Sequence, residues 1–209
     1  MKSAYIITEE SQSSRINEIK EELKAMGIDV NYSESIKRPS NQFLLETWAS
    51  KIMQKETYSI ESSDVVVFDE SLSDRFGLYV MLGIALASKD FKYNKIVVIK
   101  DENTNKLNGV LKEFKTAKTE LIKSLILGDS FEEKFAHQGT FECSDMDLTM
   151  FNLVQFLQSQ VSIIKFNITD WKNPLASIFL GACYQQGKFV IANAPDKPFY
   201  KVLVEEFYE

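Results

Sequence analysis

The feature that most constrains the fold is an uninterrupted β-branched run at residues 64–68 (DVVVF). Such a run lacks the polar alternation of a half-exposed strand and is typical of a strand buried on both faces of a parallel sheet. Parallel strands need crossover connections, which are usually helices. Strand patterns and amphipathic helix patterns do alternate along this chain. The sequence therefore predicts an α/β fold with a doubly wound, mostly parallel sheet.

The predicted elements divide the chain into three parts. The predicted strands cover residues 3–8, 28–32, 64–68, 95–99, 161–167 and 188–192. The predicted helices cover residues 14–26, 43–57, 78–88, 111–127, 146–158, 175–186 and 199–208, and residues 129–145 are polar and irregular. We expect a flavodoxin-like first half (1–100), a helical connection or insertion (101–160), and a second α/β unit with a C-terminal helix (161–209). In this prediction the second unit adds strands to the same sheet, in one continuous fold.

Composition excludes several classes of function. The formal net charge is −6, which argues against a duplex nucleic-acid surface because that surface needs clustered Lys and Arg. Only two cysteines and one histidine occur, so we expect free thiols, no metal site and no cofactor. No apolar run approaches a membrane span, and the first ten residues lack the apolar core of a secretion signal. We therefore expect a cytoplasmic protein that does not bind a membrane.

Two segments of the chain resemble each other. Residues 64–87 (DVVVFDESLSDRFGLYVMLGIALA) align without a gap on residues 162–185 (SIIKFNITDWKNPLASIFLGACYQ). Gly83 falls on Gly181, an offset of 98 residues (181 − 83 = 98). Either the chain contains a duplication or structural pseudo-symmetry, or two buried strand–helix units look alike because both need β-branched strands and small helix residues. Duplication would place two similar loops at strand carboxyl ends, where open α/β sheets bind ligands.

Four motifs in residues 3–100 carry a family resemblance. They are Tyr5 in the first strand (AYIIT), Gly27 before a short strand (AMGIDV), the strand SDVVV leading to Asp69, and the helix start GLYVMLGIA from Gly77. Together they resemble the nucleoside 2-deoxyribosyltransferases and the related deoxyribonucleotide N-glycosidases. The resemblance implies that Tyr5 lines a pocket and that Asp69 contacts the sugar or the nucleophile. It also implies a nucleophilic glutamate on the helix that follows Gly77.

The position of that nucleophile departs from the family pattern. Met81 stands where the family has its glutamate, and Leu78 stands where it has a threonine. A thioether cannot attack an anomeric carbon or stabilise an oxocarbenium-like centre, as a carboxylate does. The equivalent residue in the second segment is Phe179, which is equally inert. Both candidate sites therefore lack the nucleophile.

Each candidate site residue also has a purely structural interpretation. Tyr5 lines a pocket or is a strand tyrosine of the core. Asp69 contacts a ligand or caps a turn. Glu70 and Asp74, in the loop that follows, are displaced catalytic carboxylates or solvated surface charges.

The second segment has its own candidates. Asn167, Asp170 and Asn173 are the corresponding ligand-binding candidates there. Asn173 before Pro174 is also an ordinary helix start, with asparagine or Asp170 as the cap and proline at the first helical position.

Three hypotheses for the function follow. The leading hypothesis is a catalytically degenerate protein that binds a nucleoside or nucleotide without cleaving it. The second is an active N-glycosidase or deoxyribosyltransferase in which Glu70 or Asp74 replaces the missing nucleophile. The third is a protein–protein interaction module, with the aromatic helix at residues 199–208 sealing the core or forming a homo-oligomer contact.

Overall fold

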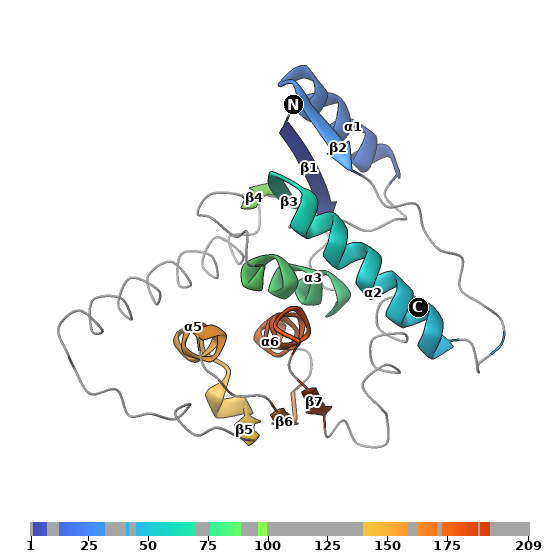
Figure 1. Cartoon of the computed structure of the whole chain (residues 1–209). Coiled ribbons are helices and arrows are strands. Elements are labelled where there is room, and N and C mark those ends of the chain that lie inside the picture. Colours follow the sequence, from blue (N-terminus) through green and yellow to red (C-terminus); the bar gives the residue numbers. More distant parts are fainter. Residues whose placement is uncertain are drawn as a thin grey trace.

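A computed structural model of the chain contains two parallel β-sheets with helices between them (Figure 1). It describes residues 2–7, 13–31, 41, 45–69, 76–88, 96–99, 140–158, 163–170, 173–187 and 189–192. The predicted helices at 111–127 and 199–208, and the loop with Glu70 and Asp74, lie outside these residues. The described part is a mixed α/β structure with parallel sheets, which confirms the predicted fold class at that level.

The first unit is built on a four-stranded sheet, sheet A. Its strands are β1 (Lys2–Ile7), β2 (Ile28–Asn31), β3 (Val65–Asp69) and β4 (Ile96–Ile99), all parallel, in the order β2-β1-β3-β4. Its helices are α1 (Ser13–Ala25), α2 (Leu45–Ser62) and α3 (Phe76–Ala87). Gly27 follows α1 with a φ of 73°, the left-handed conformation expected of a glycine C-cap.

Both faces of sheet A are covered. Side chains alternate along β1, so that Ala4 and Ile6 cluster with Ile19 of α1, whereas Tyr5 and Ile7 join the larger core that contains α2 and α3. This double coverage explains the apolar run in β3, since Val66, Val67 and Phe68 are all buried although they point to alternate faces of the sheet.

The second unit has a sheet of its own, sheet B. Its elements are β5 (Thr140–Ser144), the 3₁₀ helix η3 (Asp145–Asp147), α5 (Met150–Gln158), β6 (Ile163–Asn167), α6 (Pro174–Gln185) and β7 (Phe189–Ala192). The parallel strands lie in the order β5-β6-β7. Ile164 and Phe166 of β6 are fully buried in the core, while Lys165 between them pairs with Glu142 on β5, with Nζ and Oε1 3.1 Å apart.

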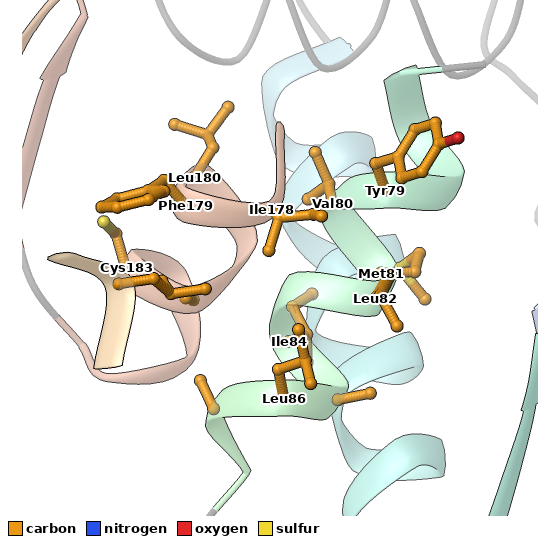
Figure 2. Close-up of a cluster of buried hydrophobic side chains, with 14 of the residues drawn as sticks. Tyr79, Val80, Met81, Leu82, Ile84, Leu86, Ile178, Phe179, Leu180 and Cys183 are labelled. Atoms are coloured by element: carbon orange, nitrogen blue, oxygen red, sulfur yellow. The ribbon is translucent and has the colours of Figure 1, made fainter. Parts of the chain in front are cut away.

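The two units meet through α3 and α6, which lie between the sheets (Figure 1). Neither helix carries a charged side chain, so each needs apolar contacts on every side. At their crossing a side chain on Gly83 would overlap the carbonyl oxygen of Ile178 and lie 2.8 Å from its carbonyl carbon. A side chain on Gly181 would meet the carbonyl group of Val80 in the same way. Figure 2 shows the apolar side chains that these two helices contribute to the core.

This junction corrects one prediction. The second unit does not extend the first sheet: the seven described strands form two separate sheets. The physical reason is the apolar character of α3 and α6 on all sides, because each can be buried only between its own sheet and another helix layer.

A second prediction was wrong for residues 140–144, which form β5 rather than irregular chain. This strand lies at the edge of sheet B, and its sequence TFECS alternates polar and apolar residues without a β-branched run. The strand is specified by its pairing with β6 rather than by its own propensity. Residues 140–158 therefore pack with the second unit rather than forming a separate connection.

Smaller differences concern helix ends. Helix α2 continues to Ser62, five residues beyond the predicted end at residue 57 (62 − 57 = 5), and α5 begins at Met150 rather than at residue 146. Within the described residues, no helix is both long and apolar enough to cross a membrane.

Candidate functional site

The carboxyl edge of sheet A is the candidate site, because the order of its strands reverses there. From β1 the chain moves to β2 on one side, and from β3 it moves to β4 on the other, so the strand order reverses between the adjacent strands β1 and β3. Open α/β sheets bind ligands in the crevice outside the carboxyl ends of the strands at such a reversal. Strand β3 ends there at Asp69, and α3 begins seven residues later at Phe76 (76 − 69 = 7).

Three of the predicted site residues are buried in the large core that the two units share. Tyr5, Leu78 and Met81 belong to one hydrophobic cluster, with exposed fractions of 5%, 9% and 4%. Tyr5 lies on β1 beside Val66 of β3, and its side chain points to the α3 side of sheet A. Met81, which the motif resemblance aligns with a glutamate, is thus a buried apolar side chain within the core. This placement agrees with the structural interpretation of Tyr5 as a core residue.

The polar candidates lie nearer the edge. Asp69 is the last residue of β3, in register with Ile99 of β4, and Gly77 lies in the first turn of α3. That turn contains no acidic residue, so its backbone N–H groups are not opposed by a carboxylate of the helix itself. Glu70 and Asp74 lie outside the described residues, so their proposed catalytic role stays a prediction.

At the corresponding edge of the second unit, backbone N–H groups donate hydrogen bonds to side chains of the same unit. Asn173 caps α6, because its Oδ1 accepts a hydrogen bond from the backbone N–H of Leu175 at 3.0 Å, with Pro174 at the helix start. This confirms the structural interpretation of Asn173. Asn167, at the end of β6, and Asp170 are both exposed. The described strands of this unit run β5-β6-β7 in chain order, so they contain no reversal like that between β1 and β3.

At this second edge, the carboxylate of Asp145 also accepts hydrogen bonds from backbone N–H groups. Asp145, which follows β5, accepts hydrogen bonds from the backbone N–H of Thr169 at 3.0 Å and from its hydroxyl at 2.5 Å. It also accepts one from the backbone N–H of Asp170 at 3.3 Å. The hydrogen bonds from Thr169 lower the pKa of the Asp145 carboxyl below its ordinary value. Beside it, Asp147 Oδ2 accepts from the N–H of Ser144 at 2.9 Å and from its hydroxyl at 2.7 Å.

Replacement of Asp145 by asparagine is expected to remove part of the acid-dependent stability. A carboxyl whose pKa is lowered by folding stabilises the protein above the pKa of the unfolded chain, about 3.9 for Asp, and loses that effect as the pH falls through the folded pKa. Urea unfolding should therefore show the wild type more stable than Asp145→Asn at pH 6, with the difference shrinking towards pH 3. A difference that is independent of pH would contradict this role.

One residue with unusual chemistry was missed by the sequence analysis. Glu56 lies in α2, and burial raises the pKa of its carboxyl to about 7. The signal was present: position 56 continues the apolar stripe of Ile52 and Met53 by one helical turn, so a carboxylate falls on the face that packs inward.

Within the described ranges, no group of three or more His, Cys, Asp or Glu side chains could hold a metal ion. The two cysteines, Cys143 and Cys183, are free thiols, and both are fully buried. Burial, with smaller effects from Asp147 and Asp145, raises the pKa of the Cys143 thiol to about 12, so this thiol is a poor nucleophile. Comparison with protein-family models, curated proteins and solved structures finds no match to this chain.

Proposed function

We propose that the chain is a catalytically degenerate nucleoside- or nucleotide-binding protein, with its ligand at the carboxyl edge of sheet A. In this proposal the first unit is doubly wound and flavodoxin-like. The observation that carries the proposal is the reversal of strand order between β1 and β3, directly beside the end of β3 and the start of α3. The motif resemblance to the nucleoside 2-deoxyribosyltransferases supplies the ligand class.

In this proposal the protein does not cleave the glycosidic bond of its ligand, because Met81 cannot act as the nucleophile. Cleavage of an N-glycosidic bond in that family needs a carboxylate that attacks the sugar. Met81 is 4% exposed within an apolar cluster, so it offers neither a nucleophile nor a polar surface for one supplied by solvent. Binding without cleavage is the function that this arrangement supports best.

The first unit is preferred over the second for two reasons. The described strands of sheet B contain no reversal of order, and Asp145 and Asn173 already accept the backbone N–H groups of residues 169, 170 and 175. Donors that are occupied by the protein's own carboxylate and amide oxygens are not available to a ligand phosphate or hydroxyl. We therefore place one ligand, not two, on each chain.

Titration calorimetry against deoxynucleosides, nucleoside mono- and triphosphates and cyclic nucleotides tests this function. We expect one ligand class to bind with a stoichiometry of one, while chromatography of the mixtures detects no free base. Asp69→Asn should weaken binding by about tenfold, equivalent to about 1.4 kcal/mol, because Asp69 is the polar residue that ends β3. Asn167→Ala, at the equivalent position of the second unit, is the matched control and should bind as the wild type does.

Two outcomes would overturn the proposal. If no member of the panel binds, the proposed nucleoside or nucleotide ligand is wrong. Release of free base, abolished by Glu70→Gln or Asp74→Asn, would instead establish an N-glycosidase that uses a displaced carboxylate.

A further inference from the structure

The two units share one order of helices and strands, apart from an addition to the first. The second unit runs β5-α5-β6-α6-β7, with the short η3 between β5 and α5. The first unit runs β1-α1-β2-α2-β3-α3-β4. Without α1 and β2 it becomes β1-α2-β3-α3-β4, and its strands then lie in chain order, as those of sheet B do. Among the described helices and strands, α1 and β2 are thus the part of the first unit without a counterpart in the second.

The strand pairing shows which strands correspond. Val65 of β3 pairs with Ala4 of β1, and Ile163 of β6 pairs with Thr140 of β5, in parallel ladders. Val65 and Ile163 are counterparts under the 98-residue offset (163 − 65 = 98). Strand β5 therefore takes the place of β1 beside the central strand of its unit.

Gly83 of α3 lies against two residues of α6. A Cβ atom on Gly83 would lie 2.8 Å from the carbonyl carbon of Ile178 and 3.0 Å from the backbone nitrogen of Ala182. Spacings of three and four residues place Ile178, Gly181 and Ala182 on one face of α6. This face of α6 therefore packs directly on α3 at Gly83.

Gly181 makes the same contacts in the opposite direction. A Cβ atom on Gly181 would lie 2.8 Å from the carbonyl carbon of Val80 and 3.1 Å from the backbone nitrogen of Ile84. Val80 and Ile84 are the counterparts of the two residues that Gly83 meets (178 − 80 = 98 and 182 − 84 = 98). Contacts in which residue i of one copy meets residue j of the other, and j meets i, are isologous. This is the kind of contact that joins two identical subunits.

The carboxyl-terminal ends of the two helices also meet. The Nε2 atom of Gln186, just beyond α6, donates a hydrogen bond to the carbonyl oxygen of Ala87 at the end of α3, at 3.1 Å. The counterpart of Ala87 is Gln185 (185 − 87 = 98), so similar positions of both copies lie near each other here as well. The side chains differ at this point, because Gln185 donates a hydrogen bond from Nε2 to Oε1 of Glu61 on α2.

We infer that the chain is an internal pseudo-dimer, in which two copies of one β-α-β-α-β unit are joined by an isologous contact between α3 and α6. The face of α3 that carries Gly83 is self-complementary, and the partner that it fits is a second copy of the same helix. The presence of α1 and β2 in the first copy creates the reversal of strand order between β1 and β3, so the two copies differ at their carboxyl edges. This inference does not depend on the proposed ligand.

Exchange of side chains across the junction of the full chain tests the inference by urea unfolding. Ile84→Ala leaves a cavity and should raise the unfolding equilibrium constant by about thirtyfold or more. Ala182→Ile adds volume to a packed core and should raise it by about tenfold. The double variant moves the larger side chain from one helix to the equivalent position of the other, so it should stay within about tenfold of the wild type. Independent effects would instead multiply to about three hundredfold.

Met81→Phe and Phe179→Met form the matched control exchange. These residues are also counterparts (179 − 81 = 98), but they lie on the sides of α3 and α6 that face away from each other (Figure 2). Phe179 instead stacks with Phe156 of α5, with ring centroids 6.4 Å apart. The effects of these two changes on stability should therefore add.

The inference is overturned if the double variant of Ile84 and Ala182 is as unstable as independent effects require, or if the control exchange shows the same recovery. Should either single variant fail to fold, Val80→Ile with Ile178→Val repeats the test with a change of one methyl group at each position. That double variant should be more stable than the less stable of its two single variants. The absence of such a recovery would likewise show that α3 and α6 are not interchangeable at the junction.

Discussion

Replacement of Gly83 by alanine is expected to destabilise the protein by about 3 kcal/mol or more, at the upper end for overpacking, and Gly181→Ala should do the same. At each position a methyl group would overlap a backbone carbonyl of the opposite helix, with the carbonyl carbon 2.8 Å away. A backbone group cannot rotate aside as a side chain can, so α3 and α6 must separate. Separation would lose contacts along the whole junction between the units.

Urea unfolding of the two variants measures this effect. Gly27→Ala is the control, because a methyl group there meets nothing within 4 Å and only the φ of 73° is unfavourable. We expect that change to cost about 1 kcal/mol. Equal, small losses for all three variants would show that α3 and α6 do not cross as closely as described.

The Gly83 and Gly181 contacts are reciprocal under the 98-residue offset between the two similar segments. Gly83 meets Ile178, which matches Val80, and Gly181 meets Val80 itself. The strand registers are less alike. The next strands, KIVVI (95–99) and KFVIA (188–192), match Ile96 with Phe189. Val66 pairs with Ile96, but its counterpart Ile164 pairs with Val190, one residue further along. Double replacement of both glycines should therefore cost less than the sum of the single changes, because either one already separates the helices.

Replacement of Met81 by glutamate, the residue that the family carries, is expected to cost on the order of 4 kcal/mol at pH 8. The side chain at this position is 4% exposed and belongs to the large hydrophobic core. A carboxylate there loses its hydration without gaining a described charged partner on α3, so its pKa should rise. The cost should fall as the pH drops through the ordinary glutamate pKa of about 4.3, because the group then becomes neutral in the unfolded chain as well.

Thermal and urea unfolding at pH 4.5 and pH 8 distinguish this effect from a packing defect. Met81→Leu is the matched control, since a swap that conserves volume in a core usually costs less than about 1.5 kcal/mol and should be independent of pH. A Met81→Glu protein as stable as the wild type at pH 8 would mean that position 81 opens to solvent or to a polar pocket. That result would favour a catalytic site on α3.

The candidate site could be predicted from the sequence only in part. The motifs at Tyr5, Asp69 and Gly77 predicted a site near the ends of β1 and β3, and these strands are paired side by side in sheet A. Periodicity cannot tell a pocket tyrosine from a core tyrosine, because both occupy the same inward face of a strand. Glu56 was missed because its burial depends on what packs against α2, which only the tertiary structure decides.

By itself, the sequence determined the elements whose patterns are local. Examples are the β-branched strand β3, the Gly27 cap of α1 and the Asn173 cap of α6. Tertiary structure alone decided that the strands form two sheets, that the TFECS segment is the edge strand β5, and that Gly83 and Gly181 meet across the junction. The physical reason is the separation in sequence of the groups that interact. Hydrogen bonds within a helix or turn join near neighbours in the chain. The burial of apolar helices instead depends on surfaces supplied by residues about a hundred positions away.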